Sequence, residues 1–325
     1  MKKQLFVTTF CSLLLAGYGC SSPQANDAVQ DLTQYVDPYI GSGGHGHVFV
    51  GANVPYGLVQ LGPSSIPQEW DWTSGYHISD STVIGFPHMH LSGTGIGDLH
   101  DITLMPVTGE VTYARGVESD QTSGLWSYSD RSKEVVKPGY YATHLLRYNV
   151  DVELTATKRV GFHKYTFNQK ENAAVVFDLQ NGGCWDSPTK AYINKVDDKT
   201  IEGYRYSSGW ANDQRVFFVA EFSEPITSLD VIVDRGEAVA DKGEGKIVYA
   251  RANVDAQKPV YVKVALSPTS IENAKLNMES ELPGWDFEGT IAQADQAWEK
   301  ALAKVEMESA DVKSKKIFYT ALYHT

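Results

Sequence analysis

The sequence is poor in positive charge and has no long apolar run after its N-terminal region. It carries 28 Lys and Arg against 40 Asp and Glu, a formal net charge of −12 over 325 residues. Nucleic-acid phosphates require clusters of Lys and Arg, so we expect no nucleic-acid partner. No later stretch is long and apolar enough to cross a bilayer, so no internal membrane span is predicted.

The first residues have the pattern of a secretory signal. Lys2 and Lys3 precede the apolar run Leu5–Ala16, and small residues then lead to Cys20. Because this run is too short to span a membrane, we expect a signal peptide over residues 1–19 rather than a transmembrane helix.

Cysteine is also scarce, with three in the whole sequence. Gly17-Tyr-Gly-Cys20 resembles a bacterial lipobox, in which the cysteine becomes the lipidated first residue, although Gly17 stands where Leu is usual. Signal cleavage near the same place without lipidation is the alternative. Residues 20–33 are largely polar and predict a flexible tether. If Cys11 is removed and Cys20 lipidated, Cys184 has no intrachain disulfide partner and is expected to be a small buried apolar residue.

The middle of the sequence alternates apolar and polar residues with a period of two, which is typical of half-buried strands. Val152, Leu154 and Ala156 alternate with polar neighbours, and residues 260–266 do the same, with Lys263 among the residues between the valines. We therefore expect many strands between about residues 100 and 266.

Other apolar runs in this region are continuous. Ala173–Leu179 and Arg215–Phe222 predict strands buried on both faces, and turn residues such as Asn181-Gly-Gly separate the runs. Many strands joined by short polar turns predict a mainly β fold, a large antiparallel β-sandwich over residues 34–268.

After Pro268 the pattern becomes helical. Thr269-Ser-Ile-Glu272 is a capping box that predicts a helix to about Ser280, and Pro283-Gly284 ends it. From Ile291 to Val305, apolar residues repeat at three- and four-residue spacing, as on one face of a helix. We assign residues 269–309 to linker helices.

A last helix is predicted from about Asp311. Its apolar residues are Ile317, Phe318, Ala321 and Leu322, and no Gly, Pro or polar tail ends it before Thr325. We therefore expect residues 310–325 to be the first helix of a truncated helical domain.

Residues 70–106 combine aromatic, histidine, glycine and acidic residues and contain no Lys or Arg. Glycine lets backbone approach a ligand closely, aromatic rings suit the apolar face of a sugar, and His and Asp suit its hydroxyls. The mixture points to carbohydrate chemistry. Trp70, in a loop-like segment, is the best candidate for a sugar platform, whereas Trp72 is expected to pack in the interior.

The glycines at Gly93, Gly95 and Gly97 give the next segment a tight, irregular path. Such a loop can bring Thr94 and Asp98 close to a ligand, so both are included as candidate substrate-binding residues. The alternative for Asp98 is that it braces the loop by accepting backbone amides.

Several histidines accompany these glycines, and their role stays open. Gly41-Ser-Gly-Gly-His-Gly-His47 lacks the Lys-Ser/Thr ending of a phosphate loop. A zinc site would need three or four ligands; the imidazoles can equally satisfy buried backbone groups or contact a ligand directly. We assign no metal ligand within this sequence. The histidines concerned are His45, His47, His88, His90 and His100.

A glycosidase needs two carboxyl groups that flank the scissile bond. Asp71, Asp98 and Asp101 are the acids of this region, and no context marks any of them as the general acid or base. Ser92, His100 and Asp101 lack the Gly-x-Ser-x-Gly elbow of serine hydrolases, so a triad is not favoured. No catalytic residue is assigned within this sequence.

Five segments stand out as a set, and together they resemble glycoside hydrolase family 92. They are Asp37-Pro-Tyr-Ile-Gly-Ser-Gly-Gly-His-Gly-His47, Gly51-Ala-Asn-Val-Pro-Tyr-Gly-Leu-Val-Gln-Leu61, Gly75-Tyr76, Gly85-Phe-Pro-His-Met-His-Leu-Ser-Gly-Thr-Gly-Ile-Gly-Asp98 and Pro283-Gly-Trp-Asp286. Phe318–Thr325 also resembles the start of that family's helical domain, and the match covers residues 34–325. Val50 and Pro87 depart from the family pattern and affect only the expected shape of their loops.

The resemblance implies an exo-acting, inverting α-mannosidase, in many members specific for α-1,2 links. It implies a β-sandwich packed on an (α/α)6 barrel through linker helices, with a bound Ca2+ between them. In the family the catalytic acid and base come from the helical domain, so we expect them, with the calcium ligands, beyond Thr325. Trp70 is the position carried over as a contact for the leaving sugar.

The sequence is thus predicted to be the N-terminal part of an α-mannosidase that acts on mannose-containing glycans and is inactive alone. We expect an exported bacterial lipoprotein anchored by Cys20 to the outer membrane, in the periplasm or at the cell surface. The alternatives are a non-catalytic carbohydrate-binding surface lipoprotein and a glycosidase of another sugar specificity.

Overall fold

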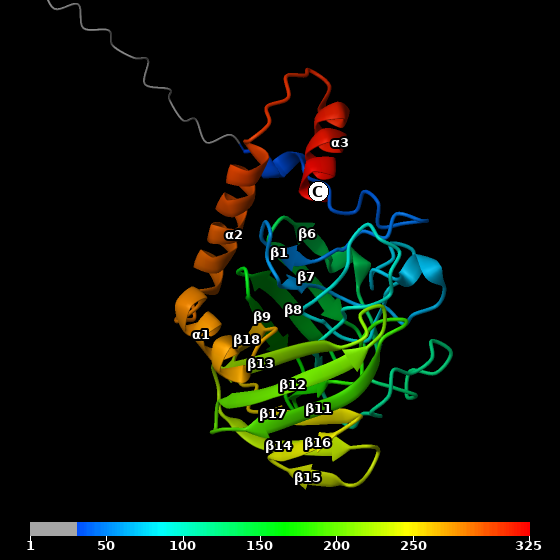
Figure 1. The fold of residues 1–325 in the computed structure, drawn as a ribbon, viewed down its shortest axis with the longest axis vertical. Helices are drawn as coiled ribbons and strands as arrows, with labels where there is room; N and C mark the ends of the chain where they lie inside the picture. The colour runs from blue at the N-terminus through cyan, green and yellow to red at the C-terminus, as the bar shows by residue number, and fades with distance from the viewer. Residues whose placement is uncertain (1–30) are drawn as a thin grey trace, which may run out of the picture. The chain divides into compact units, whose positions relative to one another are not determined.

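The computed structural model describes residues 31–325. The predicted signal peptide, Cys20 and most of the predicted tether lie outside the described residues and stay predictions. Strands are the main regular structure of the described chain, and three α-helices follow them at the C-terminal end (Figure 1). The mainly β fold predicted from the alternation is confirmed.

The larger sheet has nine strands, and every neighbouring pair is antiparallel. In spatial order the strands are β16 (Lys242–Gly245), β11 (Ser187–Lys195), β12 (Thr200–Ser208), β13 (Gln214–Phe222), β18 (Val260–Ser267), β9 (Val160–Phe167), β8 (Val150–Ala156), β7 (Tyr140–Leu145) and β6 (Val135–Lys137).

A second antiparallel sheet has five strands in the order β15 (Ala238–Ala240), β14 (Ile226–Val233), β17 (Val248–Val254), β10 (Ala174–Asp178) and β4 (Thr103–Val107). Two short pairs accompany the large sheets: β1 (Ala52–Asn53) with β2 (Gln60–Leu61), and β3 (Thr82–Val83) with β5 (Ser127–Tyr128). One apolar cluster, which includes Leu154, Phe177 and Phe218, draws residues from both large sheets. The two sheets thus enclose one core, as in a β-sandwich.

Strand burial follows the sequence pattern in most places. On β8, Val150, Val152 and Leu154 are fully buried while Asp151 and Glu153 are not. Every residue of β10 is buried, as its continuous apolar run predicts. Burial on β13 is less complete, because Arg215 remains exposed and Phe217 and Glu221 are only partly covered.

Lys263 contradicts the simple alternation, because its side chain is buried on the face away from the sandwich core. Helix α1 (Ile271–Glu281) covers that face, so the sheet has a second apolar layer. The Lys263 Nζ donates to the carbonyl oxygen of Leu282 at 3.2 Å and pairs with Glu221 at 2.7 Å. It also lies 4.2 Å from the ring centroid of Trp285. These contacts supply the partners that a buried ammonium group needs.

The helices begin at side-chain caps. Ser270 caps α1 by accepting the backbone N–H of Asn273, so the capping residue is Ser270 rather than the predicted Thr269. Asp286 caps α2 (Phe287–Leu302) and Asp311 caps α3 (Val312–Tyr323) in the same way. Each cap satisfies a backbone donor that would otherwise have no partner.

The predicted apolar faces of the last two helices need correction. Ala294 and Trp298 of α2 are buried, but Val305 lies beyond the end of α2 and is exposed. On α3 the buried residues are Tyr319, Thr320 and Tyr323, whereas Ile317 is exposed. Tyrosine buries its ring while its hydroxyl stays hydrogen-bonded, which a hydropathy pattern does not register.

The start of the described chain is fixed to α2. The backbone N–H groups of Leu32 and Thr33 donate to the two carboxylate oxygens of Glu299 at 3.0 and 2.7 Å. Leu32 packs with Trp298 and Leu302 in a third apolar cluster. The last residues of the predicted tether therefore belong to the packed structure. None of the helices within residues 31–325 is long and apolar enough to cross a membrane.

Trp298 joins α2 to the sandwich, since its indole N–H donates to the carbonyl oxygen of Asn53 at 2.8 Å and its ring contacts Tyr323. We predict that Trp298→Ala lowers the free energy of unfolding by about 3–5 kcal/mol, as expected for a large cavity in a packed interior. Urea unfolding measures this loss. The exposed Gln296→Ala on the same helix should change stability by less than about 0.5 kcal/mol, and an equal loss in both variants would contradict the assignment.

Candidate functional site

Trp70 begins a short 3-10 helix, Trp70–Trp72, and the residue is 53% exposed. The indole N–H donates to the carbonyl oxygen of Gly95 at 2.9 Å. The His47 ring lies 4.2 Å from the Trp70 ring, centroid to centroid, and the His45 ring lies 5.4 Å away. The ring is thus held by neighbours and still offers half of its surface to solvent, as a sugar platform must.

Gly95 is required where it contacts Trp70. Its φ of +62° is a conformation that glycine adopts without strain. A Cβ atom at this position would lie 2.7 Å from the Trp70 ring. The loop from Gly93 to Asp98, called here the glycine loop, therefore packs its backbone directly against the indole.

The other two candidate residues on the glycine loop differ in their surroundings. Thr94 is exposed, and its Oγ1 accepts the backbone N–H of Ile96 at 3.2 Å. Asp98 is buried, and its two carboxylate oxygens accept the backbone N–H groups of Leu99 at 2.8 Å and Trp210 at 2.7 Å. Burial raises the pKa of Asp98, and these two hydrogen bonds oppose that rise. The geometry of Asp98 is that of a brace, and its contact with substrate stays a prediction.

Trp72, which was predicted to pack, contacts His77 and Asp80. Its ring stacks on His77 with centroids 4.3 Å apart, and its indole N–H donates to Asp80 at 2.7 Å. The two tryptophans of the short helix therefore differ, because Trp72 is bound on its ring face and at its N–H while much of Trp70 remains open.

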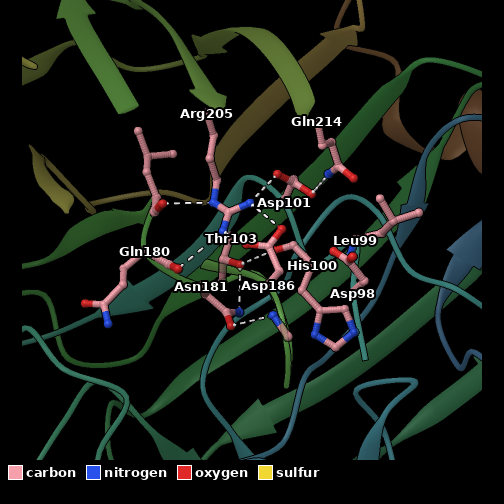
Figure 2. A network of polar contacts seen from close by, with 12 residues as sticks. Asp98, Leu99, His100, Asp101, Thr103, Gln180, Asn181, Asp186, Arg205 and Gln214 are labelled. Atoms are coloured by element: carbon pink, nitrogen blue, oxygen red, sulfur yellow. Dashed lines mark hydrogen bonds and ion pairs between the residues drawn. The ribbon is translucent and has the colours of Figure 1, made fainter. Parts of the chain in front are cut away.

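Asp101, just after the glycine loop, belongs to a buried ion cluster. The guanidinium of Arg205, on β12, contacts the Asp101 carboxylate at 2.6 Å and also pairs with Asp186 (Figure 2). Gln214, the first residue of β13, donates to the second oxygen of Asp101. The Arg205 Nε donates to the carbonyl oxygen of Leu179 at 3.0 Å. Three separate chain segments thus converge on one cation.

Burial dominates the electrostatics of this cluster. It raises the pKa of Asp101 to about 6, and the nearby Arg205 charge limits that rise. The two carboxylates beside Arg205 raise the pKa of its guanidinium above its ordinary value despite burial. Because removing one partner of a buried ion pair strands the other charge, this cluster fixes the positions of the segments that carry it.

Four histidines form a second buried group. The His88 and His163 Nε2 atoms lie 2.8 Å apart, and the Tyr165 hydroxyl lies 2.7 Å from the His163 Nδ1. The His90 and His100 rings lie 4.7 Å apart, and both contact the Ser64 hydroxyl. Burial lowers the pKa of His88 and His90 to about 4, and it lowers that of His100 and His163 well below 6.5.

The histidines do not assemble a metal site within residues 31–325, where no group of three or more His, Cys, Asp or Glu side chains is arranged to hold an ion. The ring nitrogens of His88 and His90 face the carbonyl oxygens of Ile102 and Gln60. His45 is largely exposed and contacts Asp71 at 2.6 Å.

The candidate acids do not form a pair of open carboxylates. Asp98 and Asp101 have both oxygens engaged by protein donors, and Asp71 contacts His45. The Ser92 hydroxyl accepts the backbone N–H of Phe49 at 3.0 Å and makes no hydrogen bond to His100 or Asp101. Asp71, Asp98 and Asp101 are therefore not arranged as the two carboxyl groups that glycoside hydrolysis uses.

Sequence reasoning missed Arg205, Asp186 and the exposed tryptophans Trp185 and Trp210. The alternation on β12 places Arg205 on the inward face with Ile201, and an inward arginine in a strand signals a buried partner. Nothing local to the other three marks them. Cys184 is free and half-buried, and burial raises the pKa of its thiol.

Two family models match the chain in sequence. The glycosyl hydrolase family 92 N-terminal domain matches residues 35–267, and the family 92 catalytic domain matches residues 273–325. The chain belongs to glycosyl hydrolase family 92. The predicted family is therefore confirmed, and the sandwich corresponds to the family's N-terminal domain.

Solved family 92 structures share this fold. An α-mannosidase of the family from Bacteroides thetaiotaomicron, in complex with mannoimidazole, is 34% identical with a TM-score of 0.86, over 91% of this chain and 40% of that one. An inverting family 92 mannosidase from Bacteroides thetaiotaomicron VPI-5482 is 22% identical with a TM-score of 0.74, over 90% of this chain and 39% of that one. The latter likeness concerns the fold alone.

A curated relative of the chain is also described as a glycosidase. An uncharacterized secreted glycosidase from Arthroderma benhamiae is 24% identical over 331 residues, which cover 91% of this chain and 41% of the relative. This family 92 chain thus spans about two fifths of the length of the proteins it matches.

The buried histidines predict acid sensitivity. With pKa values near 4, His88 and His90 bind fewer protons in the native state than in the unfolded state between pH 4 and 6.5. Stability should therefore rise with pH across this window and fall on acidification.

We predict that His90→Gln lowers the slope of unfolding free energy against pH by up to about 1.4 kcal/mol per pH unit near pH 5, the value for one proton. Urea unfolding between pH 4.5 and 7 measures the slope in the variant and in the unaltered chain. Because only the difference in slope is read, a uniform loss of stability does not affect the result. Identical slopes would contradict the burial of a neutral His90.

Proposed function

We propose that this chain is the N-terminal part of a calcium-dependent, inverting exo-α-mannosidase that removes α-1,2-linked mannose from glycans. The supporting observation is the match along 91% of the chain to a family 92 α-mannosidase that binds mannoimidazole. The sandwich contributes one wall of the binding cleft, and the remainder of the helical domain contributes the reacting groups.

Trp70 supports this division of roles. Its half-exposed ring is held at the N–H by Gly95 and beside His47, so it presents a rigid apolar surface. Such a surface suits the leaving sugar, the unit that must be held while the glycosidic bond breaks. Rigid aromatic contact costs little conformational entropy on binding.

The proposed reaction inverts the configuration at the anomeric carbon, and this outcome defines the groups that the enzyme needs. A carboxylic acid protonates the leaving oxygen, and a carboxylate on the opposite face of the sugar activates water. The acids described here are engaged by protein donors or paired with histidine, so we place both reacting groups beyond Thr325. We place the calcium ligands there too, because residues 31–325 hold no cluster that fits an ion. By itself, the chain is proposed to be inactive.

We further propose that the protein is exported as a lipoprotein, with Cys20 as its lipid anchor in the outer membrane. The lipobox-like segment Gly17–Cys20 supports this proposal. The relative described as a secreted glycosidase is consistent with export.

The function is tested on a full-length protein that contains this chain and the rest of the helical domain. We expect it to hydrolyse α-1,2-mannobiose, with β-mannose as the first product by proton NMR, because inversion reverses the anomeric configuration. Chelation by EGTA should abolish turnover, and added Ca2+ should restore it.

Residues 21–325 alone should show no turnover under the same conditions. Turnover by this shorter chain would place the catalytic acid and base within residues 21–325 and contradict the proposal that they lie beyond Thr325. Binding of mannosides by the full-length protein without hydrolysis would favour a carbohydrate-binding lipoprotein, and hydrolysis of glucosides or galactosides in preference would point to another specificity.

Trp70 has its own test. We predict that Trp70→Ala raises the KM for α-1,2-mannobiose by about tenfold, the loss of one well-placed aromatic contact. Trp70→Phe, which keeps a flat ring, should raise it less. Thermal unfolding of each variant separates this effect from misfolding, and an unchanged KM in a folded Trp70→Ala protein would remove Trp70 from the site.

A further inference from the structure

Three exposed tryptophans are fixed to the glycine loop. Trp70 donates its indole N–H to the carbonyl oxygen of Gly95. Trp185 donates its backbone N–H to the carbonyl oxygen of Gly97 at 2.9 Å, and Trp210 donates its own to the Asp98 carboxylate at 2.7 Å. Their exposed fractions are 53%, 49% and 70%. Large exposed rings gathered on one short segment are typical of a binding surface.

Trp185 and Trp210 differ from most tryptophans of the described chain in having a free indole N–H. The indoles of Trp72, Trp126 and Trp298 all donate to protein oxygens. No protein acceptor within residues 31–325 contacts the indole N–H of Trp185 or Trp210, and neither ring packs on another ring there. Each therefore combines an apolar face with an unused hydrogen-bond donor.

The position of Trp210 is specified by its neighbours. It lies in the turn between β12 and β13, next to Gly209. A Cβ atom at Gly209 would lie 2.6 Å from the Asp98 carboxylate and 3.1 Å from the Asp186 Cα, so only glycine allows this approach. Asp98 thus acts as a positioning residue for Trp210.

The same buried cation fixes all three supporting segments. Arg205 pairs with Asp186, which follows Trp185 in the chain, and with Asp101, which follows the glycine loop (Figure 2). Gln214, at the end of the turn that carries Trp210, donates to Asp101. The exposed rings therefore stand on backbone that the interior holds rigidly.

We propose that Trp185 and Trp210 form a second sugar-binding wall, for glycan residues farther from the scissile bond than the one at Trp70. The inference rests on the proposed function. The three tryptophans are anchored at Gly95, Gly97 and Asp98. The face of one aromatic ring matches one hexose ring, so a single sugar at Trp70 leaves the rings of Trp185 and Trp210 open to further glycan residues. Linked hexoses offer both apolar faces and hydroxyl acceptors for the free indole N–H groups.

Chain-length dependence of binding tests this proposal on the full-length protein. Isothermal titration calorimetry with EGTA present, so that turnover is suppressed, gives the Kd of α-1,2-mannobiose and of α-1,2-mannotetraose. We expect the unaltered protein to bind the tetrasaccharide more tightly. Trp210→Ala and Trp185→Ala should each weaken tetrasaccharide binding by about tenfold and leave disaccharide binding within about twofold. Trp210→Phe, which keeps the ring, is the matched control and should retain most of the affinity.

Two outcomes overturn the wall. One is equal binding of both oligosaccharides by the unaltered protein. The other is a Trp210→Ala variant that loses the same affinity for the disaccharide as for the tetrasaccharide, above all if its Tm is also lowered. That result would assign the ring to packing against the rest of the helical domain. If the full-length protein binds the tetrasaccharide more tightly than the disaccharide and Trp210→Ala removes that difference, the second sugar-binding wall is supported even when no mannoside is hydrolysed. The hydrolysis assay alone then decides the proposed function.

Discussion

Arg205 lies inside the β-sandwich with no exposed surface, and its guanidinium contacts the carboxylates of Asp101 and Asp186. A buried cation without such partners is unstable, so the fold must bring both acids to it. Asp101 stands 104 residues before Arg205 in the sequence and Asp186 stands 19 before it. Satisfying one charge therefore sets how the glycine loop and the β12–β13 turn lie against each other. The positions of the exposed tryptophans follow from the way these segments are held together.

The nine-stranded sheet is covered on two sides by different means. The five-stranded sheet covers one face, and α1 with the start of α2 covers the other. Lys263 shows the effect of this double coverage, since a residue in an alternating strand becomes buried once a helix lies over it. Its ammonium group then needs Glu221 and the Leu282 carbonyl oxygen as partners. The sheet is therefore an interior layer rather than an outer wall along this stretch.

Strand and helix periods predicted the architecture because those patterns are local. The sandwich and the three helices follow from them, and the family follows from sets of motifs such as the segment ending at Asp98. The candidate site was predicted only at Trp70, Thr94 and Asp98, all within one segment. Arg205 and Trp210 lie more than 100 residues away, and no spacing rule links them to the glycine loop. Lys263 departs from the alternation because a helix distant in sequence buries it, and Ile317 departs from the helical pattern because α3 buries Tyr319 and Tyr323 instead.

Asn53 receives hydrogen bonds from two helices, at its carbonyl oxygen from Trp298 and at its side chain from the Tyr323 hydroxyl. One residue of the family's N-terminal domain thus serves as a shared acceptor for two positions in the catalytic-domain segment. Recombination between residues 267 and 273, where the two family segments meet, would therefore separate Asn53 from its two hydrogen-bond donors. Joining this sandwich to an unrelated helical partner would leave Asn53 with two vacant acceptor positions, so the two halves are expected to be inherited together.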